Sequence, residues 1–264
     1  MANTTIGLDE LSDYTPRNFE YFLQLGLTKF HVAKACRQQC FLDKEEMEAI
    51  KKLGLRKFNL GCKTYTMNIN DGWLNIEKFA NGIPGKFLKS KLFDDESESV
   101  FLNFNLRRGI PVENETLTFV YHSLLIDAFD YESALILFDD IYQSLMSGGK
   151  HRISTVDSKA LLESCARRDS SSVSFNRDIY GDKFSIDRSD VYDEPGSLLS
   201  HLMFGYERQS LWDLDMLVST LERAGFRNIC HRERGDSEDA EIKRVENSYH
   251  QGRSEYCLYI ECEK

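Results

Sequence analysis

The spacing of hydrophobic residues changes several times along the chain, and each change predicts a different kind of element. Over residues 8–55, apolar residues recur at the three- to four-residue spacing of a helix. The acidic segment that begins at Asp43 suits a helix N-terminus, where the helix dipole favours negative charge. The pattern therefore predicts an N-terminal helical cap over residues 1–55. Its apolar positions include Phe19, Phe22, Leu23 and Leu27.

After residue 55, short apolar runs alternate with longer amphipathic segments. Helices are predicted over residues 130–146, ending at Ser147-Gly148-Gly149, and over residues 212–224. Strands that alternate with helices favour a parallel sheet with helices on both faces. The predicted fold class of residues 56–264 is therefore α/β, a Rossmann-like, doubly wound and mainly parallel sheet. The short runs predict two strands within residues 56–77, and further strands near 100–106, 117–122, 150–156, 227–233 and 255–262.

Residues 168–200 interrupt this alternation. The segment is rich in serine and aspartate and carries scattered aromatic residues, Tyr180, Phe184 and Tyr192. Long loops inside a compact domain usually serve a function. We therefore expect an insert or lid at the place where a substrate enters.

Composition narrows the classes of partner. The chain has 264 residues, 41% of them apolar, and a formal net charge of −10. Nucleic-acid binding draws its affinity from clustered Lys and Arg, so we expect no nucleic-acid partner. No apolar run approaches the roughly 20 residues that span a bilayer. Because residues 1–14 also lack the basic and apolar regions of a signal peptide, a cytoplasmic location is expected.

The seven cysteines form no Cys-x-x-Cys pair. An odd number with this spacing favours reduced, buried thiols over a disulfide framework or a zinc site. Cys36 and Cys40 would lie one helical turn apart, with His31 before them, so a metal site is conceivable. A partly apolar helix face is the favoured interpretation of these positions, and no metal is predicted.

The most informative stretch is residues 56–77. It reads as a short buried strand that ends at Gly61, a polar loop, and a second strand that ends at Glu77. In nucleotide-binding α/β sheets, a glycine after the first strand lets a ligand approach the backbone. An acid at the end of the second strand accepts hydrogen bonds from ribose hydroxyls. This pattern predicts an adenosine-type cofactor.

Four segments together resemble the class I S-adenosylmethionine-dependent methyltransferases, in particular a bacterial branch associated with glycan and small-molecule modification. The resemblance extends from about Lys57 to the C-terminus. Its segments are Asn59-Leu-Gly-Cys62 with Gly72-Trp-Leu-Asn-Ile-Glu77, Ile110-Pro-Val-Glu-Asn-Glu-Thr-Leu-Thr-Phe-Val-Tyr121, Leu145-Met-Ser-Gly-Gly-Lys-His-Arg-Ile153, and a closing segment with Trp212-Asp213, Glu222-Arg-Ala-Gly-Phe226, Gly235-Asp-Ser-Glu238 and Glu246.

The resemblance implies S-adenosylmethionine as the cofactor and a set of residues that contact it. Two of these positions depart from the family pattern. Lys63 stands where the family usually has another glycine, and Asn105 stands where an aspartate near the adenine is customary. The implied cofactor-binding residues are Asn59, Gly61, Cys62, Lys63, Glu77, Asn105, Leu106 and Tyr121.

The catalytic part of the pattern departs further. Leu124 and Ala128 occupy the positions of two family histidines, so the customary base is missing. His122 could replace it if its ring points into the cleft, and His201 is a second candidate base. Tyr206 is expected to line the substrate pocket.

Three functions remain open from the sequence. The favoured one is O-methylation of a sugar, a glycan precursor or a small metabolite. The second is a catalytically degenerate methyltransferase-fold protein that acts as a partner subunit or regulator. The third is a fold reused for another nucleotide or metabolite. The sequence leaves the acceptor and the oligomeric state, homo-oligomer or hetero-oligomer, undecided.

Overall fold

The computed structural model describes residues 21–25, 28–32, 50–62, 65–78, 87–90, 99–167, 208–249 and 256–264, together with the single positions 196, 200 and 203. For residues 21–32, 87–90, 99, 100 and 103 it describes the backbone alone. The strands of the main sheet are β3 (Lys57–Leu60), β4 (Trp73–Glu77), β5 (Phe87–Ser90), β6 (Ser99–Asn103), β7 (Leu117–Ser123), β8 (Leu145–Val156), β9 (Arg227–Arg232) and β10 (Cys257–Glu263).

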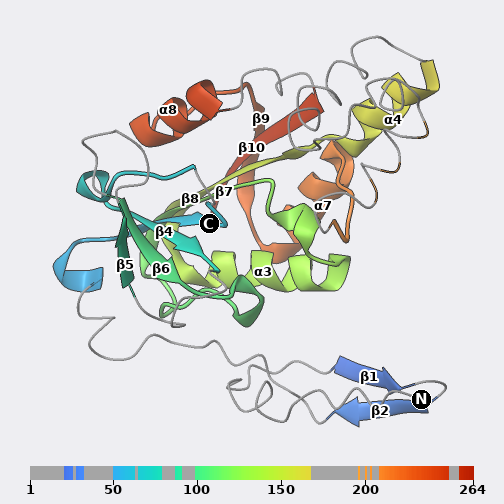
Figure 1. Cartoon of the computed structure of the whole chain (residues 1–264), viewed down its shortest axis with the longest axis horizontal. Coiled ribbons are helices and arrows are strands. Elements are labelled where there is room, and N and C mark those ends of the chain that lie inside the picture. The colour runs from blue at the N-terminus through green and yellow to red at the C-terminus, as the bar shows by residue number, and fades with distance from the viewer. Residues whose placement is uncertain are drawn as a thin grey trace.

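These strands form one eight-stranded sheet in the order β5-β6-β4-β3-β7-β8-β10-β9 (Figure 1). The central strands β6, β4, β3, β7 and β8 run parallel, whereas β5 and β10 are antiparallel to their neighbours. From β3 the chain proceeds outward through β4 and β6, and it then returns to build β7 and β8 on the other side of β3. The order therefore reverses between β3 and β7, and the predicted mainly parallel sheet is confirmed.

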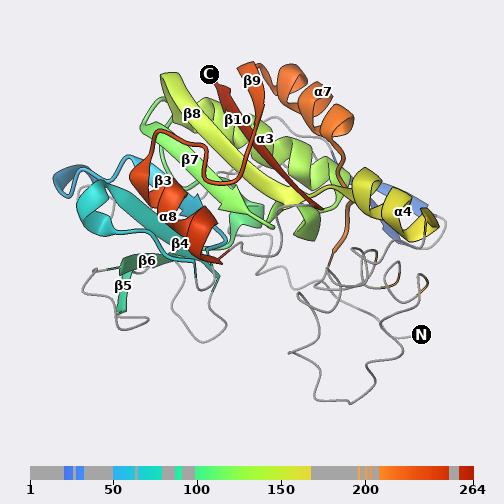
Figure 2. The same cartoon turned by 90° about the horizontal axis from the view of Figure 1, so that it is seen from above.

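Helices cover both faces of the sheet. The described helices are α3 (Tyr131–Ser144), α4 (Ser158–Arg167), α7 (Leu214–Ala224) and α8 (Ala240–Tyr249). Phe138 of α3 and Leu217 of α7 belong to the large core cluster on one face. Ile242 and Val245 of α8 pack with Trp73 on the other face. Figure 2 shows α8 and the pair α3 and α7 on opposite sides, which confirms the doubly wound arrangement.

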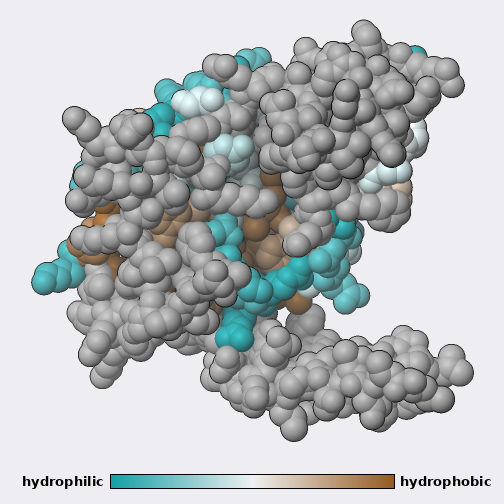
Figure 3. Space-filling view, viewed as in Figure 1, coloured by the Kyte–Doolittle hydropathy of each residue, from teal (hydrophilic) through white to brown (hydrophobic). Residues whose placement is uncertain are grey.

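The sequences of α3 and α7 explain where these helices begin and end. Asp130 caps α3 by accepting a hydrogen bond from the Ser133 amide, and Asp213 caps α7 in the same way. Gly225 ends α7 with a φ of 103°, which is a backbone conformation that favours glycine. Each helix turns apolar residues toward the sheet. In the view of Figure 3, hydrophobic side chains accordingly lie between the hydrophilic surfaces of α8 and α3.

The predicted turn at Ser147-Gly148-Gly149 is absorbed into a strand. Helix α3 ends at Ser144, and β8 begins at the next residue and includes both glycines. The pairing with β7 shifts between Leu117↔Leu145 and Phe119↔Lys150, so this part of β8 is irregular. Gly148, with a φ of 77°, supplies the backbone freedom that the irregularity needs.

The N-terminal helical prediction is wrong for residues 21–25 and 28–32, whereas residues 50–52 are helical as predicted. β1 (Tyr21–Leu25) and β2 (Thr28–Val32) form a separate antiparallel pair. Their sequences are rich in aromatic and β-branched residues, which favour strands. Only two residues, the first of them Gly26, separate them, as in a β-hairpin. The other residues of the predicted cap before residue 50 lie outside the described ranges.

In the described part of the chain, no helix is both long enough and apolar enough to cross a membrane.

Candidate functional site at the carboxyl ends of the central strands

The carboxyl ends of β3, β4, β6 and β7 lie at one edge of the sheet, because these strands are parallel. In open α/β sheets, ligands bind outside the carboxyl ends of the strands at the point where the strand order reverses. That point lies between β3, which is followed by Gly61, and β7, which is followed by Leu124. Glu77 and Asn105 lie at the ends of β4 and β6 along the same edge.

Gly61 follows β3 with a φ of 61°, a conformation that a residue with a side chain rarely adopts. Its amide donates to the Ile76 carbonyl at 2.8 Å, which joins the end of β3 to the end of β4. Cys62 is buried, and burial followed by the nearby charge of Glu77 raises the pKa of its thiol. Cys62 is therefore a packed thiol and not a nucleophile poised for reaction.

The described part of the connection from β3 to β4 contains only a short 3-10 turn, η1 (Ile69–Asp71). Dinucleotide sites place the N-terminus of an α-helix after the glycine loop, where its dipole binds phosphate. No α-helix follows Gly61 in residues 65–72. Residues 65–72 therefore offer no α-helix N-terminus to bind a phosphate.

Glu77 is half-buried at the end of β4. One of its carboxylate oxygens, Oε1, accepts a hydrogen bond from the Lys78 amide at 3.0 Å. Its backbone carbonyl accepts from the Phe104 amide, also at 3.0 Å, so the ends of β4 and β6 are joined. The carboxylate lies at the same edge as Gly61, as the sequence predicted.

Asn105 caps η2 (Leu106–Arg108), and its Oδ1 accepts from the Arg107 amide at 3.1 Å. Its amide nitrogen is the part of the side chain that can donate to a ligand. Leu106, expected beside the cofactor, is buried in the main core cluster. It therefore supports the edge by packing.

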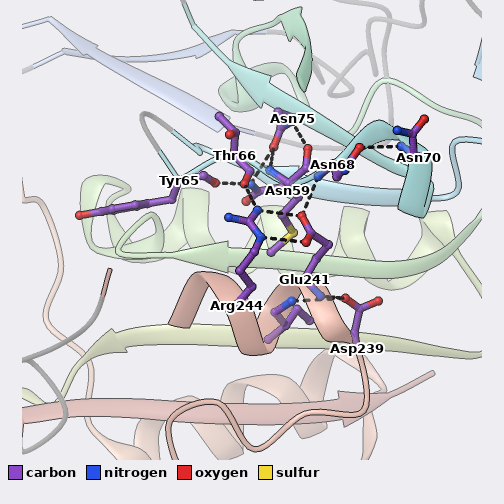
Figure 4. A network of polar contacts seen from close by, with 11 residues as sticks. Asn59, Tyr65, Thr66, Asn68, Asn70, Asn75, Asp239, Glu241 and Arg244 are labelled. Atoms are coloured by element: carbon purple, nitrogen blue, oxygen red, sulfur yellow. Dashed lines mark hydrogen bonds and ion pairs between the residues drawn. The ribbon is translucent and has the colours of Figure 1, made fainter. Parts of the chain in front are cut away.

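Asn59, a predicted cofactor residue, supports the loop that follows Gly61 (Figure 4). Its amide nitrogen donates to the Tyr65 carbonyl at 2.7 Å and to Asn75 Oδ1 at 2.9 Å. Asn75 in turn accepts from the Met67 amide at 2.9 Å and donates to the Met67 carbonyl at 2.8 Å. Both asparagines are buried, and their amides hold the loop from inside.

Helix α8 holds the same loop from outside (Figure 4). Glu241 Oε2 accepts from the Asn68 amide at 2.7 Å, and Arg244 donates to the Thr66 carbonyl at 2.7 Å. Arg244 and Glu241 also form an ion pair at 2.8 Å. Residues 65–68 are therefore fixed between two buried amides and two charged groups, with no helix of their own.

Tyr121 and His122 lie on opposite faces of β7, because successive side chains of a strand alternate. Tyr121, expected near the cofactor, is buried in the cluster under α8 with Ile242 and Val245. The tyrosine therefore supports α8 by packing.

His122 is fully buried in the core, beside Phe138 and His151. Burial lowers its pKa to about 3. A general base must reach its substrate and accept a proton near the working pH. The structure meets neither requirement at His122, so the condition that its ring points into the cleft is not fulfilled.

One buried ion pair at this edge was not predicted. It joins η3 (Ile126–Ala128), just after β7, to the residues that follow the insert. Arg208 Nε donates to Asp127 Oδ2 at 2.7 Å, and the Asp127 carbonyl accepts from the Gln209 amide at 2.7 Å. An aspartate inside the apolar run Leu124–Ala128 was the available signal, since a buried carboxylate needs a partner. Its partner lies 81 residues away, and no spacing rule identifies it.

Arg107 ties two strand ends together. Its Nη2 donates to the Ala128 carbonyl at 2.8 Å, and its guanidinium lies 4.9 Å from the centroid of the Phe129 ring. The arginine therefore links η2, after β6, to η3, after β7.

Lys63, His201 and Tyr206 lie outside the described residues. Within the described residues, no group of three or more His, Cys, Asp or Glu side chains is arranged to hold a metal ion.

No protein-family model matches the chain, and no curated protein matches it. Solved structures of similar fold include an S-adenosylmethionine-dependent methyltransferase from Mesorhizobium loti, 14% identical, with a TM-score of 0.41 over 83% of this chain and 97% of that one. Another is a SAM-dependent methyltransferase from Archaeoglobus fulgidus, 11% identical, with a TM-score of 0.44 over 83% and 94% of the two chains.

A third is phosphoethanolamine N-methyltransferase 2 from Haemonchus contortus in complex with S-adenosyl-L-methionine, 11% identical, with a TM-score of 0.41 over 83% of this chain and 52% of that one. Similarities of this size carry no functional argument.

Proposed function

We propose that this protein is an S-adenosylmethionine-dependent methyltransferase. The observation that carries the proposal is the meeting of Gly61, Glu77 and Asn105 at the carboxyl ends of neighbouring parallel strands, beside the point where the strand order reverses. A glycine, a carboxylate and an amide in this order suit a ligand that has a ribose and an adenine. Residues 65–68, which contain no helix, suit a cofactor that carries no phosphate.

Each residue has a separate role in holding the cofactor. Glu77 would accept hydrogen bonds from the ribose hydroxyls, and Asn105 would donate from its amide nitrogen to the adenine ring. Gly61 would allow the ligand close to the backbone. The cofactor supplies an electrophilic methyl group on its sulfonium. The protein's task is then to align an acceptor with that group and to exclude water.

The proposed acceptor is a hydroxyl group on a sugar, a glycan precursor or a small metabolite, as the family resemblance implies. Such a hydroxyl loses a proton during the reaction. His122 is too deeply buried to take it. His201 remains our candidate base, and Tyr206 remains our candidate lining of the acceptor pocket.

A catalytically degenerate partner subunit is the second candidate, and one observation favours it. Directly after β7, the chain presents Leu124 and Leu125, and Asp127 is engaged in an ion pair with Arg208. This side of the edge is apolar where a base would be expected. Methyl transfer to any acceptor would rule the second candidate out.

The first test is isothermal titration of the protein with S-adenosylmethionine and S-adenosylhomocysteine. We expect both to bind the wild type and Glu77→Ala to weaken binding about 10- to 100-fold, because a hydrogen bond to a charged group contributes about 1.5–3 kcal/mol. Glu222→Ala removes an exposed acid of α7 and serves as the matched control. Absence of binding by the wild type, or equal binding by Glu77→Ala, contradicts the proposal.

A further inference from the structure

The side chain of Leu125 stands directly over Gly61. A Cβ atom added to Gly61 would lie 2.6 Å from Leu125 Cδ1, and no real Cβ makes so close a contact. Gly61 follows β3 and Leu125 follows β7, the two strands between which the order reverses. Leu125 therefore occupies the space through which a ligand would approach the Gly61 backbone.

The turn that aims Leu125 has an unusual backbone. Leu124 has a φ of 51°, in the left-handed region that costs free energy for any residue with a Cβ. Its amide donates to the Ser154 carbonyl of the neighbouring strand β8 at 2.8 Å. Leaving the strand conformation at this residue lets two consecutive leucines point into different clusters.

Those two clusters hold the turn in place. Leu124 packs against the small cluster that contains Val156 and Leu161, and Leu125 packs against the main core. Leu125 remains only half-buried, so it lies at the border between the core and the edge. Its contacting methyl is the far end of a flexible side chain, which can rotate without moving the backbone.

We infer that Leu125 determines which ligands reach Gly61, and that it lowers affinity because a bound ligand must displace its side chain. The inference rests on the proposed function, since S-adenosylmethionine is the ligand considered. The position over Gly61 selects by size and polarity: a slender aliphatic segment can share the space with a rotated leucine, whereas a bulky or phosphate-bearing group cannot.

A size series at position 125 tests the inference by titration with S-adenosylmethionine. Leu125→Ala removes the obstruction, and we expect its Kd to fall about fivefold, which corresponds to roughly 1 kcal/mol. Leu125→Phe enlarges the obstruction and should raise the Kd more than tenfold. Ile69→Ala is the matched control, because Ile69 is a half-buried residue of the same core cluster at the opposite, amino edge of the sheet. Its Kd should equal that of the wild type.

A thermal-unfolding cycle tests the contact without any ligand. Gly61→Ala should lower Tm both through its positive φ and through the clash with Leu125. Leu125→Ala relieves only the clash. The double variant should therefore have a higher Tm than the sum of the two single shifts gives. Additive shifts would overturn the contact on which the inference depends.

The outcomes separate this inference from the proposed function. Tighter binding by Leu125→Ala than by a wild type that does bind supports the inference. Equal or weaker binding by a folded Leu125→Ala, with a wild type that does bind, overturns the inference alone. If the wild type binds neither S-adenosylmethionine nor S-adenosylhomocysteine, the proposed function fails and the inference fails with it.

Discussion

The two faces of the central sheet bury polar side chains in opposite ways. On the α8 face, Arg152 and Glu246 are both fully buried and joined by two hydrogen bonds of 3.0 and 2.8 Å. On the face covered by α3 and α7, the rings of His122 and His151 lie 5.0 Å apart, and none of their nitrogens has a hydrogen-bond partner. The charged groups of the α8 face are thus paired by hydrogen bonds, whereas the two imidazole rings of the other face are buried without hydrogen bonds.

The polar groups of the α8 face support the site, whereas the buried histidines of the other face take no part in it. The partnered groups of the α8 face act on backbone: Arg152 donates to the Glu233 and Asp236 carbonyls, and Asn75 holds Met67. They fix α8 and the loop after Gly61. The unpartnered histidines hold no loop and reach no edge. Burial of a polar group in a strand therefore indicates a role in the site only when its partners belong to the site.

The largest effect should come from breaking the Arg152–Glu246 pair. Glu246→Ala leaves a buried arginine without its counter-charge and also removes the acceptor of the Gly235 amide, 2.6 Å away. We expect the free energy of unfolding to fall by about 3–5 kcal/mol in urea denaturation.

Two comparisons control this experiment. Replacing both partners, as Arg152→Met with Glu246→Leu, should recover much of the loss, because no buried charge is left alone. Breaking the exposed pair Lys159–Asp215 should change stability by less than about 1 kcal/mol. A Glu246→Ala loss no greater than that of the exposed pair would remove the contrast between the two faces.

The histidine pair should make stability depend on pH. The folded-state pKa of His122 is lowered to about 3, and burial together with His122 lowers that of His151 well below its usual value. As the pH falls, these two histidines therefore take up protons in the unfolded chain at a higher pH than in the folded chain. The contribution of the two histidines to the free energy of unfolding is complete above the histidine pKa of the unfolded chain, near 6.5. It is lost as the pH falls below that value. At pH 5.5 the loss should be about 3 kcal/mol for the two groups.

Urea denaturation at pH 7.5 and 5.5 measures this loss. The double variant His122→Leu/His151→Leu should lose most of the dependence and be as stable as the wild type, or more so, at pH 7.5. His231→Gln, an exposed position on β9, controls for histidine content. An unchanged pH dependence in the double variant would show that carboxylates elsewhere produce it.

Asn75→Ala should have an intermediate effect. It leaves the Met67 amide, the Met67 carbonyl and the Asn59 amide without their partner in a buried place. We expect a loss of about 2 kcal/mol and, because the loop beside Gly61 loosens, a weaker affinity for S-adenosylmethionine. Stability and affinity are measured on the same sample. A stability loss with unchanged affinity would separate this loop from the site.

Arg244→Ala should have the smallest effect. Its guanidinium is partly exposed, and its bonds to Glu241 and to the Thr66 carbonyl should contribute about 0.5–1 kcal/mol. Thermal unfolding detects a change of this size as a Tm shift of a few degrees. A loss as large as that of Asn75→Ala would mean that α8, and not the buried amides, carries the loop.

Local sequence signals were enough for much of the fold. Asp213 caps the start of α7 and Gly225 caps its end, and both are residue types that favour these cap positions. Gly61 and Glu77 lie at the strand ends that the pattern predicted. Signals of this kind act over a few residues, so they do not depend on tertiary contacts and can be read from the sequence.

The rest depended on contacts distant in sequence. His122 was a candidate base because its position near a strand end was readable, but which face its ring occupies depends on α3 packing over it. Glu241 reaches the Asn68 amide across 173 residues. The strands β1 and β2 carry apolar residues whose spacing fits either a helix or a hairpin. In these cases the deciding partner is set by tertiary structure, which a single sequence does not reveal.

The most direct test of the account is hydrogen–deuterium exchange of the protein with and without S-adenosylmethionine. We predict protection of the backbone amides at residues 60–62, 77–78, 104–107 and 123–126, the carboxyl ends of β3, β4, β6 and β7. The amino edge at residues 69–72 should exchange equally in both states. Protection at the amino edge, or none at the four carboxyl ends despite saturating ligand, would contradict the placement of the site.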